Sequence, residues 1–269
     1  MSMQGAITSD ELHRRLGAFP PPALIDVRRE PAFDADPVVI PCGIRRAPES
    51  IAEWALDLEP WRAVVVYCVH GHEVSQNAAA FLRQSGFVTH TLDGGIEGWR
   101  SHGGATAPLA PPSRWVTRER PKIDRIACPW LIRRFIDPSA LFFYVPNHAV
   151  RAFAAANGAT AYDIPDVTYT HVGDDCSFDA FIRIHKLSHP ALDALAAIVR
   201  GADTSALHLA AQAPGLLAAS LGLSAMFADD HAMLKWGMLV YDSLYAWCRE
   251  AQTETHGWYP EKLRVQETA

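Results

Sequence analysis

The stretch Ala63–Leu82, AVVVYCVHGHEVSQNAAAFL, decides the fold of the first half of the chain. Its first five residues, Ala63–Tyr67, form a short apolar run, as in a strand buried on both faces of a parallel sheet. A loop that begins at Cys68 follows, and Ser75–Gln84 then predicts a helix with its N-cap at Ser75. A strand, a loop and a helix in this order indicate an α/β domain.

The neighbouring segments continue this pattern on both sides. Ala23–Val27 (ALIDV) predicts another buried strand, and Thr89–Leu92 (THTL) predicts a third. Thr8–Leu16 predicts a helix with its N-cap at Thr8 or Ser9. We therefore expect an N-terminal domain with a mainly parallel sheet flanked by helices.

A segment rich in Pro, Ala and Gly, GGATAPLAPPSR, occupies Gly103–Arg114. Proline restricts its own backbone and that of the preceding residue, so this segment predicts an extended linker. We place the first domain at residues 1–107, a proline-rich linker at residues 108–113 and a second domain at residues 114–269. A chain of 269 residues is long enough for two domains.

The second half has the pattern of a mostly helical domain. Apolar residues at three- and four-residue spacing predict four helices. These are Asp124–Phe135, Asn147–Ala156, Pro190–Arg200 and Asp230–Arg249. The short runs Leu141–Val145 and Val167–Val172 predict strands. We therefore expect an α or α+β domain.

The composition is that of a globular protein, with 49% hydrophobic and 20% charged residues. The net charge of −6 argues against nucleic acid as a partner. No apolar run approaches the roughly 18 residues of a membrane span, and the start lacks the apolar core of a signal peptide. The five cysteines are odd in number and form no CxxC pair, as in proteins of a reducing compartment. We expect a cytoplasmic protein that does not contact a membrane.

The loop after the central strand has the form of an anion-binding site. Main-chain N–H groups of a short loop at the carboxyl end of a parallel strand form an inward-pointing nest, and the next helix adds its positive end. A thiolate or a persulfide at Cys68 would be stabilised there. The remaining loop residues are Val69, His70, Gly71, His72, Glu73 and Val74. Spacing alone leaves a second interpretation open, in which Cys68 is a buried core thiol.

Four stretches of the first half, taken together, resemble the single-domain rhodaneses, a family of sulfurtransferases. They are LIDVRREPAF (Leu24–Phe33), VVVYCVHGHEVS (Val64–Ser75), AAAFLRQSGF (Ala78–Phe87) and LDGGIEGWRSHG (Leu92–Gly103). The resemblance implies that Cys68 is the catalytic nucleophile. It also implies that Asp26 and Arg28 support the site from a neighbouring strand.

The same resemblance implies sulfur transfer in two steps that require no cofactor. The Cys68 thiolate attacks the outer sulfur of thiosulfate or a similar small donor, and sulfite leaves. A thiol or cyanide then takes the sulfur from the persulfide. Many rhodaneses have an arginine near the end of the loop, whereas this loop carries His70, His72 and Glu73, so the preferred donor stays open. The two histidines either contact the donor or are ordinary exposed loop residues.

A basic cluster opens the second half, although the whole protein is acidic. Its members are Arg114, Arg118, Arg120, Lys122, Arg125, Arg133 and Arg134. Such a cluster would attract an oxyanion, a phosphate backbone or the other domain. The alternative is a solvated helix face beside the end of a linker.

Further along, residue types that bind metal ions gather without a standard zinc spacing. The candidate ligands are His171, Cys176, His185 and His231, and carboxylates lie beside several of them. Asp229 and Asp230 also suit the start of the last long helix, where they would cap it and match its dipole. Asp242 lies on that helix among aromatic residues, so it needs a partner or a function if it is buried.

Four stretches of the second half resemble the C-terminal domain of ChrB-type chromate-resistance proteins. They are KIDRIACPWLIRRFIDP (Lys122–Pro138), DIPDVTYTHVGDDCSFDAFI (Asp163–Ile182), LAAIVRGADT (Leu195–Thr204) and DDHAMLKWGMLVYDSLYAWC (Asp229–Cys248). The resemblance implies a link to chromate resistance or to chromate-responsive regulation. Chromate is a tetrahedral dianion, so we expect Arg125, Arg133 and Arg134 as candidate oxyanion ligands.

Three functional hypotheses follow. The first is a thiosulfate sulfurtransferase coupled to chromate resistance. The second is a chromate- or redox-responsive sensor or regulator that uses Cys68. The third is a metal-dependent activity of the C-terminal domain.

Overall fold

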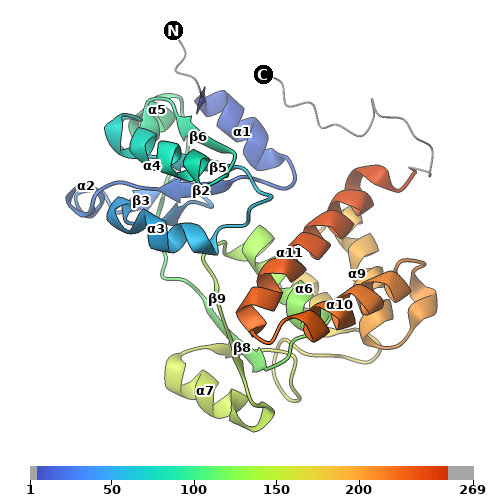
Figure 1. The fold of residues 1–269 in the computed structure, drawn as a ribbon. Coiled ribbons are helices and arrows are strands. Elements are labelled where there is room, and N and C mark those ends of the chain that lie inside the picture. The colour runs from blue at the N-terminus through green and yellow to red at the C-terminus, as the bar shows by residue number, and fades with distance from the viewer. Residues whose placement is uncertain (1–4, 254–269) are drawn as a thin grey trace.

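The computed structural model describes residues 5–253, in which two domains each fold around a core of their own (Figure 1). The first contains a five-stranded sheet of order β1-β6-β5-β2-β4, and all of its pairings are parallel. The strands are β1 (Ala6–Ile7), β2 (Ala23–Asp26), β4 (Ile44–Arg45), β5 (Val64–Tyr67) and β6 (Thr89–Leu92). The predicted mainly parallel α/β fold is confirmed.

Strand β5 lies in the centre of this sheet and is buried on both faces. Val64 and Val66 pack into one core cluster, while Val65 and Tyr67 pack into another on the opposite face. This alternation follows from the two-residue period of a strand. Because both faces are covered, the sequence of β5 is continuously apolar rather than alternating.

Helices cover both faces of the sheet. Leu82 of α4 (Glu73–Gln84) packs on the face of Val64 and Val66, together with Trp54 at the end of α3 (Ile51–Trp54). The opposite face is covered by α1 (Ser9–Gly17) and α5 (Gly95–Ser101). A short helix, α2 (Glu30–Asp34), follows β2.

The starts of these helices were predicted with mixed success. Thr8 is the N-cap of α1, where its hydroxyl accepts a hydrogen bond from the Glu11 N–H at 3.2 Å. Helix α4 begins at Glu73 with His72 as its N-cap, so the predicted cap at Ser75 is wrong. Ser75 is the third residue of α4, inside its first turn. Its hydroxyl donates a hydrogen bond to the His72 carbonyl at 3.1 Å.

The linker is attached to the first domain at its start. Strand β7 (Ala107–Pro108) pairs antiparallel with β3 (Val38–Val39). Proline is tolerated in this two-stranded pairing because edge positions do not require every N–H group. The second domain opens with β8 (Arg114–Arg118), immediately after the proline-rich segment.

The second domain is mostly helical, as predicted, and the small parallel sheet β10-β8-β9 makes it α+β. Its strands besides β8 are β9 (Leu141–Val145) and β10 (Thr160–Ala161). Its helices are α6 (Asp124–Leu131), α7 (Val150–Asn157), α8 (Ser177–Ile184), α9 (Pro190–Asp203), α10 (Ala213–Met226) and α11 (Asp230–Ala246). One helical turn of π type, Ile132–Ile136, continues α6, and another, Trp247–Ala251, continues α11.

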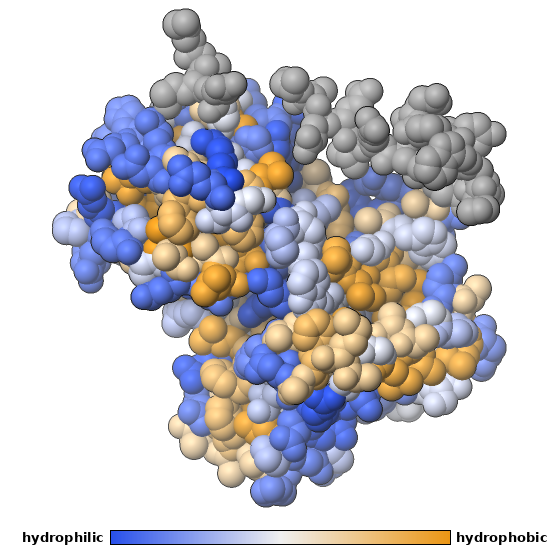
Figure 2. All heavy atoms as spheres, in the orientation of Figure 1, coloured by the Kyte–Doolittle hydropathy of each residue, from blue (hydrophilic) through white to orange (hydrophobic). Residues whose placement is uncertain are grey.

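Two expectations for this domain differ from the structure. Leu141–Val145 is the predicted strand, but Val167–Val172 is not one and pairs only through isolated bridges at Tyr169 and Val172. Its β-branched residues favour a strand, yet the segment runs along the domain surface. Helices α8 and α10 were not predicted. The apolar residues of α10 are spread around the helix, and Figure 2 shows them on its exposed face. No helix within residues 5–253 combines the length and apolar character needed to cross a membrane.

The domains meet around the buried carboxylate of Asp242 on α11. It accepts hydrogen bonds from the indole N–H groups of Trp61, at 2.9 Å, and Trp130, at 2.8 Å. Arg134 donates to both of its oxygens, at 2.9 and 2.8 Å, and also to Glu59 at 2.8 Å. Because Trp61 and Glu59 belong to the first domain, this buried network holds the domains together.

We expect Asp242→Asn to destabilise the protein by about 3 kcal/mol, because it removes one partner of a buried ion pair. Burial by itself would raise the pKa of Asp242, but Arg134 and the two indoles outweigh it and hold the pKa below its usual value. The stability from this group is therefore present at neutral pH and is lost as the pH falls below about 4.

Urea unfolding at pH 7 and at pH 3 measures this effect. The stability difference between wild type and Asp242→Asn should shrink at the lower pH. The control Asp166→Asn alters a carboxylate whose side chain is 92% exposed and should change little. A constant difference at both pH values would contradict the prediction.

Candidate functional site

Cys68 lies at the carboxyl end of β5, directly before the loop that leads into α4. The residue is buried, and its Sγ atom is 3.2 Å from the hydroxyl oxygen of Ser75. Ser75 belongs to the first turn of α4, so the sulfur lies at the amino end of that helix. The positive end of the helix dipole therefore faces the thiol.

The loop is fixed by main-chain contact with the start of α5. The carbonyl of Cys68 accepts a hydrogen bond from Ile96 at 3.0 Å, and that of Val69 accepts one from Glu97 at 3.1 Å. Gly95 permits this approach, since a Cβ atom there would lie 2.4 Å from the Cys68 carbonyl oxygen. Gly71 has a φ of 73°, and a Cβ on it would lie 2.6 Å from the Leu92 carbonyl oxygen. Both positions require glycine.

The N–H groups of the loop are available to an anion. Within residues 5–253, none of the N–H groups from Val69 to Val74 donates to a main-chain carbonyl. The side chains of His70, His72 and Glu73 are exposed, and the two imidazole rings lie 5.9 Å apart. The loop thus has main-chain donors near the thiol and titratable side chains at its surface.

Asp26 and Arg28 form a buried ion pair beside this strand. Asp26 ends β2 and pairs with Tyr67 of β5, one residue before Cys68. The Arg28 guanidinium lies 2.6 Å from an Asp26 oxygen and also donates to the carbonyls of Asp36 and Val38. The pair ties β2 to the segment before β3, so it supports the sheet edge on which the loop stands.

The three candidate oxyanion ligands do not lie together. Arg125 is 3.2 Å from Asp163 inside the second domain. Arg134 is neutralised by Asp242 and Glu59. Arg133 stacks over the Phe142 ring and donates only to the Ala140 carbonyl, at 3.3 and 3.4 Å. Helical periodicity could not reveal this separation, because it depends on where the first domain docks.

Arg133 and Arg134 line a cavity of about 700 Å³ between the domains. Its wall also contains Arg46, His231 and Lys235. Among the described residues, no carboxylate forms an ion pair with Arg133, although Asp57 and Glu59 in the same wall attract its charge from a longer distance.

The four candidate metal ligands lie in different places. Cys176 is buried at the start of α8, and its thiol contacts Asp179 at 3.3 Å. His185 accepts or donates a hydrogen bond with the Tyr169 hydroxyl at 3.1 Å and stacks on its ring. His231 lies in the wall of the cavity, 5.5 Å from the ring of Tyr144. Only His171 joins a cluster of metal-ligand type.

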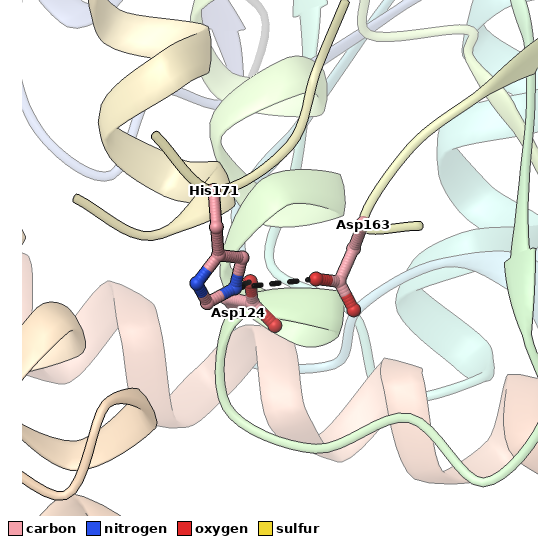
Figure 3. Close-up of side chains that lie close together, drawn as sticks. All are labelled: Asp124, Asp163 and His171. Carbon is pink, nitrogen blue, oxygen red and sulfur yellow. Dashed lines mark hydrogen bonds and ion pairs between the residues drawn. The ribbon is translucent and has the colours of Figure 1, made fainter. Parts of the chain in front are cut away.

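That cluster surrounds the Nε2 atom of His171 with carboxylate oxygens (Figure 3). The distances from Nε2 are 3.3 Å to Asp124, 3.4 Å to Asp163 and 3.3 Å to Asp203. Asp124 opens α6, Asp163 follows β10 and Asp203 ends α9. We call these four residues the His171 cluster.

The ionisable groups of the His171 cluster shift one another's pKa values strongly. Burial and the neighbouring carboxylates raise the pKa of Asp203 to about 7, and burial raises that of Asp124. Hydrogen bonds from His171 and Arg118 hold the pKa of Asp163 below its usual value despite its burial. Hydrogen bonds to Asp124 and Asp163 raise the pKa of His171 to about 10.

Both domains match families of known proteins. The rhodanese-like domain family matches residues 8–102, and the family described as ChrB, C-terminal domain, matches residues 115–248. Thiosulfate sulfurtransferase GlpE of Pseudomonas syringae pv. syringae is 38% identical over 79 residues, which are 29% of this chain and 72% of that enzyme. The chain belongs to the rhodanese-like family.

The second domain is a ChrB C-terminal domain. Protein ChrB of Cupriavidus metallidurans is 35% identical over 133 residues, which are 49% of this chain. The match spans two fifths of that relative, 40% of its length.

Among solved structures, a rhodanese-related protein from Thermoplasma volcanium has 24% identity and a TM-score of 0.35, and the match covers 39% of this chain and all of that structure.

Sequence reasoning missed three members of the His171 cluster, Asp124, Asp163 and Asp203. They are separated along the chain by dozens of positions, so no spacing rule joins them. All three fall in stretches that resemble ChrB-type proteins, which is the signal that could have directed attention to them.

We expect Gly95→Ala in the rhodanese-like domain to destabilise it more than Gly158→Ala, by at least about 1 kcal/mol. Both glycines have nearly the same positive φ, 59° and 58°, so the backbone penalty for alanine is matched. Only at Gly95 does the new Cβ collide with main-chain atoms, whereas nothing lies within 4 Å of it at Gly158. Denaturant unfolding of the two variants measures the difference, and equal losses would show that the loop has room to move.

Proposed function

We propose that this protein moves sulfane sulfur from thiosulfate or a similar donor to a thiol or to cyanide through a persulfide on Cys68. The observation that carries the proposal is the position of the Cys68 thiol at the amino end of α4, at the start of a loop whose N–H groups from Val69 to Val74 do not donate to a main-chain carbonyl within residues 5–253. Its relationship to thiosulfate sulfurtransferases supports the choice of donor.

In the first step, the Cys68 thiolate attacks the outer sulfur of thiosulfate, the sulfur–sulfur bond of the donor breaks, and sulfite leaves with its electron pair. The Ser75 hydroxyl lies 3.2 Å from Sγ, and turning its hydrogen from the His72 carbonyl to the sulfur would let it donate to the thiolate. Main-chain N–H groups of Val69–Val74 then stabilise the persulfide anion. The exposed imidazole N–H groups of His70 and His72 would donate hydrogen bonds to the anionic donor.

In the second step, an acceptor thiolate attacks the outer sulfur of the persulfide, and Cys68 leaves as a thiolate. No group outside the chain and its two substrates is needed to balance this reaction. All five cysteines are free thiols, which suits the reducing cytoplasm, where small thiols supply the acceptor.

We expect wild-type protein treated with thiosulfate to gain one sulfur atom in intact-mass spectra and to turn over thiosulfate with cyanide. Cys68→Ser should gain no sulfur and should lower turnover to the background rate, because a serine hydroxyl cannot form the persulfide. The matched control is Cys42→Ser, which removes an exposed thiol and should keep both properties. Sulfur retained by Cys68→Ser would contradict the mechanism.

We further propose that chromate, a tetrahedral dianion, binds in the cavity between the domains. Among the described residues no carboxylate forms an ion pair with Arg133, and Arg46 and Lys235 add positive charge to a wall that also contains Asp57 and Glu59. The similarity of the second domain to ChrB supports chromate as the ligand. Arg125 lies away from this cavity, so the oxyanion site does not include it.

We expect Arg133→Ala to weaken chromate binding by about tenfold or more, because it removes a charged hydrogen-bond donor. The matched control is Arg114→Ala. Arg114 stacks on Phe143 at 5.0 Å, just as Arg133 stacks on Phe142 at 5.0 Å, but it does not line the cavity. Equilibrium dialysis with chromate, and with sulfate as competitor, measures the effect; equal affinities in both variants would exclude this site.

A further inference from the structure

The His171 cluster has the dimensions of a metal-ligand shell. Ligand atoms about 2.0–2.2 Å from one ion lie about 2.8–3.6 Å from their neighbours in octahedral or tetrahedral geometry. The three contacts of His171 Nε2, at 3.3, 3.4 and 3.3 Å, fall within this range. One oxygen each of Asp124 and Asp163 and one nitrogen of His171 also lie within 4.8 Å of one another.

Hydrogen bonding alone does not account for this arrangement. Nε2 of an imidazole carries at most one hydrogen, which points along one direction in the ring plane. Three carboxylate oxygens around that nitrogen therefore compete for a single donor. A cation among them would be attracted by all three at once.

The negative charge of the buried carboxylates also favours a bound cation. Asp124 is only 2% exposed, and within residues 5–253 its one ion-pair partner is His171. Asp203 likewise pairs only with His171 among the described residues. The carboxyls of Asp124 and Asp203 lie within hydrogen-bonding distance of each other, where their negative charges repel. Asp124 and Asp203 share this one imidazole, so one negative charge is left in excess, and a proton or a metal ion would balance it.

The carboxylate of Asp163 is held in place by hydrogen-bond donors of neighbouring residues, as metal-ligating carboxylates usually are. Arg118 donates to its Oδ2 atom at 2.7 Å, and Arg125 lies 3.2 Å from the same oxygen. Ser177, the first residue of α8, donates to the other oxygen, Oδ1, at 3.0 Å. The oxygen that faces His171 is this Oδ1, so the arginines fix the carboxylate without covering its inner side.

We propose that the His171 cluster binds one divalent first-row metal ion, with Mn²⁺, Fe²⁺ and Zn²⁺ as the class. Asp124 and Asp163, whose oxygens group with the His171 nitrogen, favour hard ions, and the imidazole favours ions beyond Mg²⁺ and Ca²⁺. The His171 side chain is 40% exposed, so the ion would be open to solvent on that side and could take water or a small oxyanion as a further ligand. The proposal is independent of sulfur transfer, which uses the other domain.

Mn²⁺ is the sharpest probe, because it binds carboxylates and imidazole but disfavours the thiols elsewhere in the chain. Full-length protein is freed of metal with a chelator and titrated with Mn²⁺, and free Mn²⁺ is followed by electron paramagnetic resonance. We expect about one Mn²⁺ bound per chain. Fe²⁺ and Zn²⁺ should compete with Mn²⁺ for this site, and Zn²⁺ should bind more tightly than Fe²⁺, in the usual order of divalent-ion affinities.

His171→Ala and Asp124→Asn should each weaken Mn²⁺ binding about tenfold or more. The matched controls are His185→Ala, a histidine of the same domain outside the cluster, and Asp166→Asn, an exposed carboxylate close in sequence to Asp163. Both controls should bind Mn²⁺ like wild type. Circular dichroism checks that each variant is folded, and partly exposed His171 provides a test even if Asp124→Asn does not fold.

Two results would overturn the proposal. The first is wild-type protein that binds none of the three ions in stoichiometric amount. The second is His171→Ala protein that binds Mn²⁺ as tightly as the His185→Ala control. Either would mean that protons, rather than a metal ion, balance the buried carboxylates.

Discussion

The sulfur site depends on the contact between two stretches of main chain, the loop after β5 and the start of α5. Ile96 and Glu97 donate to the carbonyls of Cys68 and Val69, so those carbonyls turn toward α5. A peptide group that points its oxygen one way points its N–H the other way, so the N–H groups of Val69 and His70 point away from α5. The contact exists only because Gly95 has no side chain.

In the second domain, buried carboxylates determine which segments of the chain come together. Asp242 is satisfied by donors from both domains, so the interface is specified by polar geometry rather than by apolar area alone. The His171 cluster has a different balance, since Asp124 and Asp203 share His171 as their one ion-pair partner among the described residues. This difference in charge compensation is what separates a structural ion pair from a candidate metal centre.

The sequence revealed the parts of this protein that local rules govern. The apolar run of β5 and the cap at Thr8 depend on neighbours a few residues away, and the structure matches them. The partner of Asp242 could be expected but not named, because Trp61 lies 181 positions away. The His171 cluster was beyond reach for the same reason. Helix α10 escaped notice because its apolar residues show no single face.

Helix α6 connects the two unusual polar regions of the second domain. Asp124 is its first residue, and Ile123 before it has a positive φ of 41° that sets where the helix begins. Trp130 on α6 and Arg134 in the turn that continues it both bind Asp242 at the domain interface. About 15 Å of helix separates Asp124 from Arg134. Helix α6 and the turn that continues it therefore carry one residue of the His171 cluster and two residues that bind Asp242 at the domain interface.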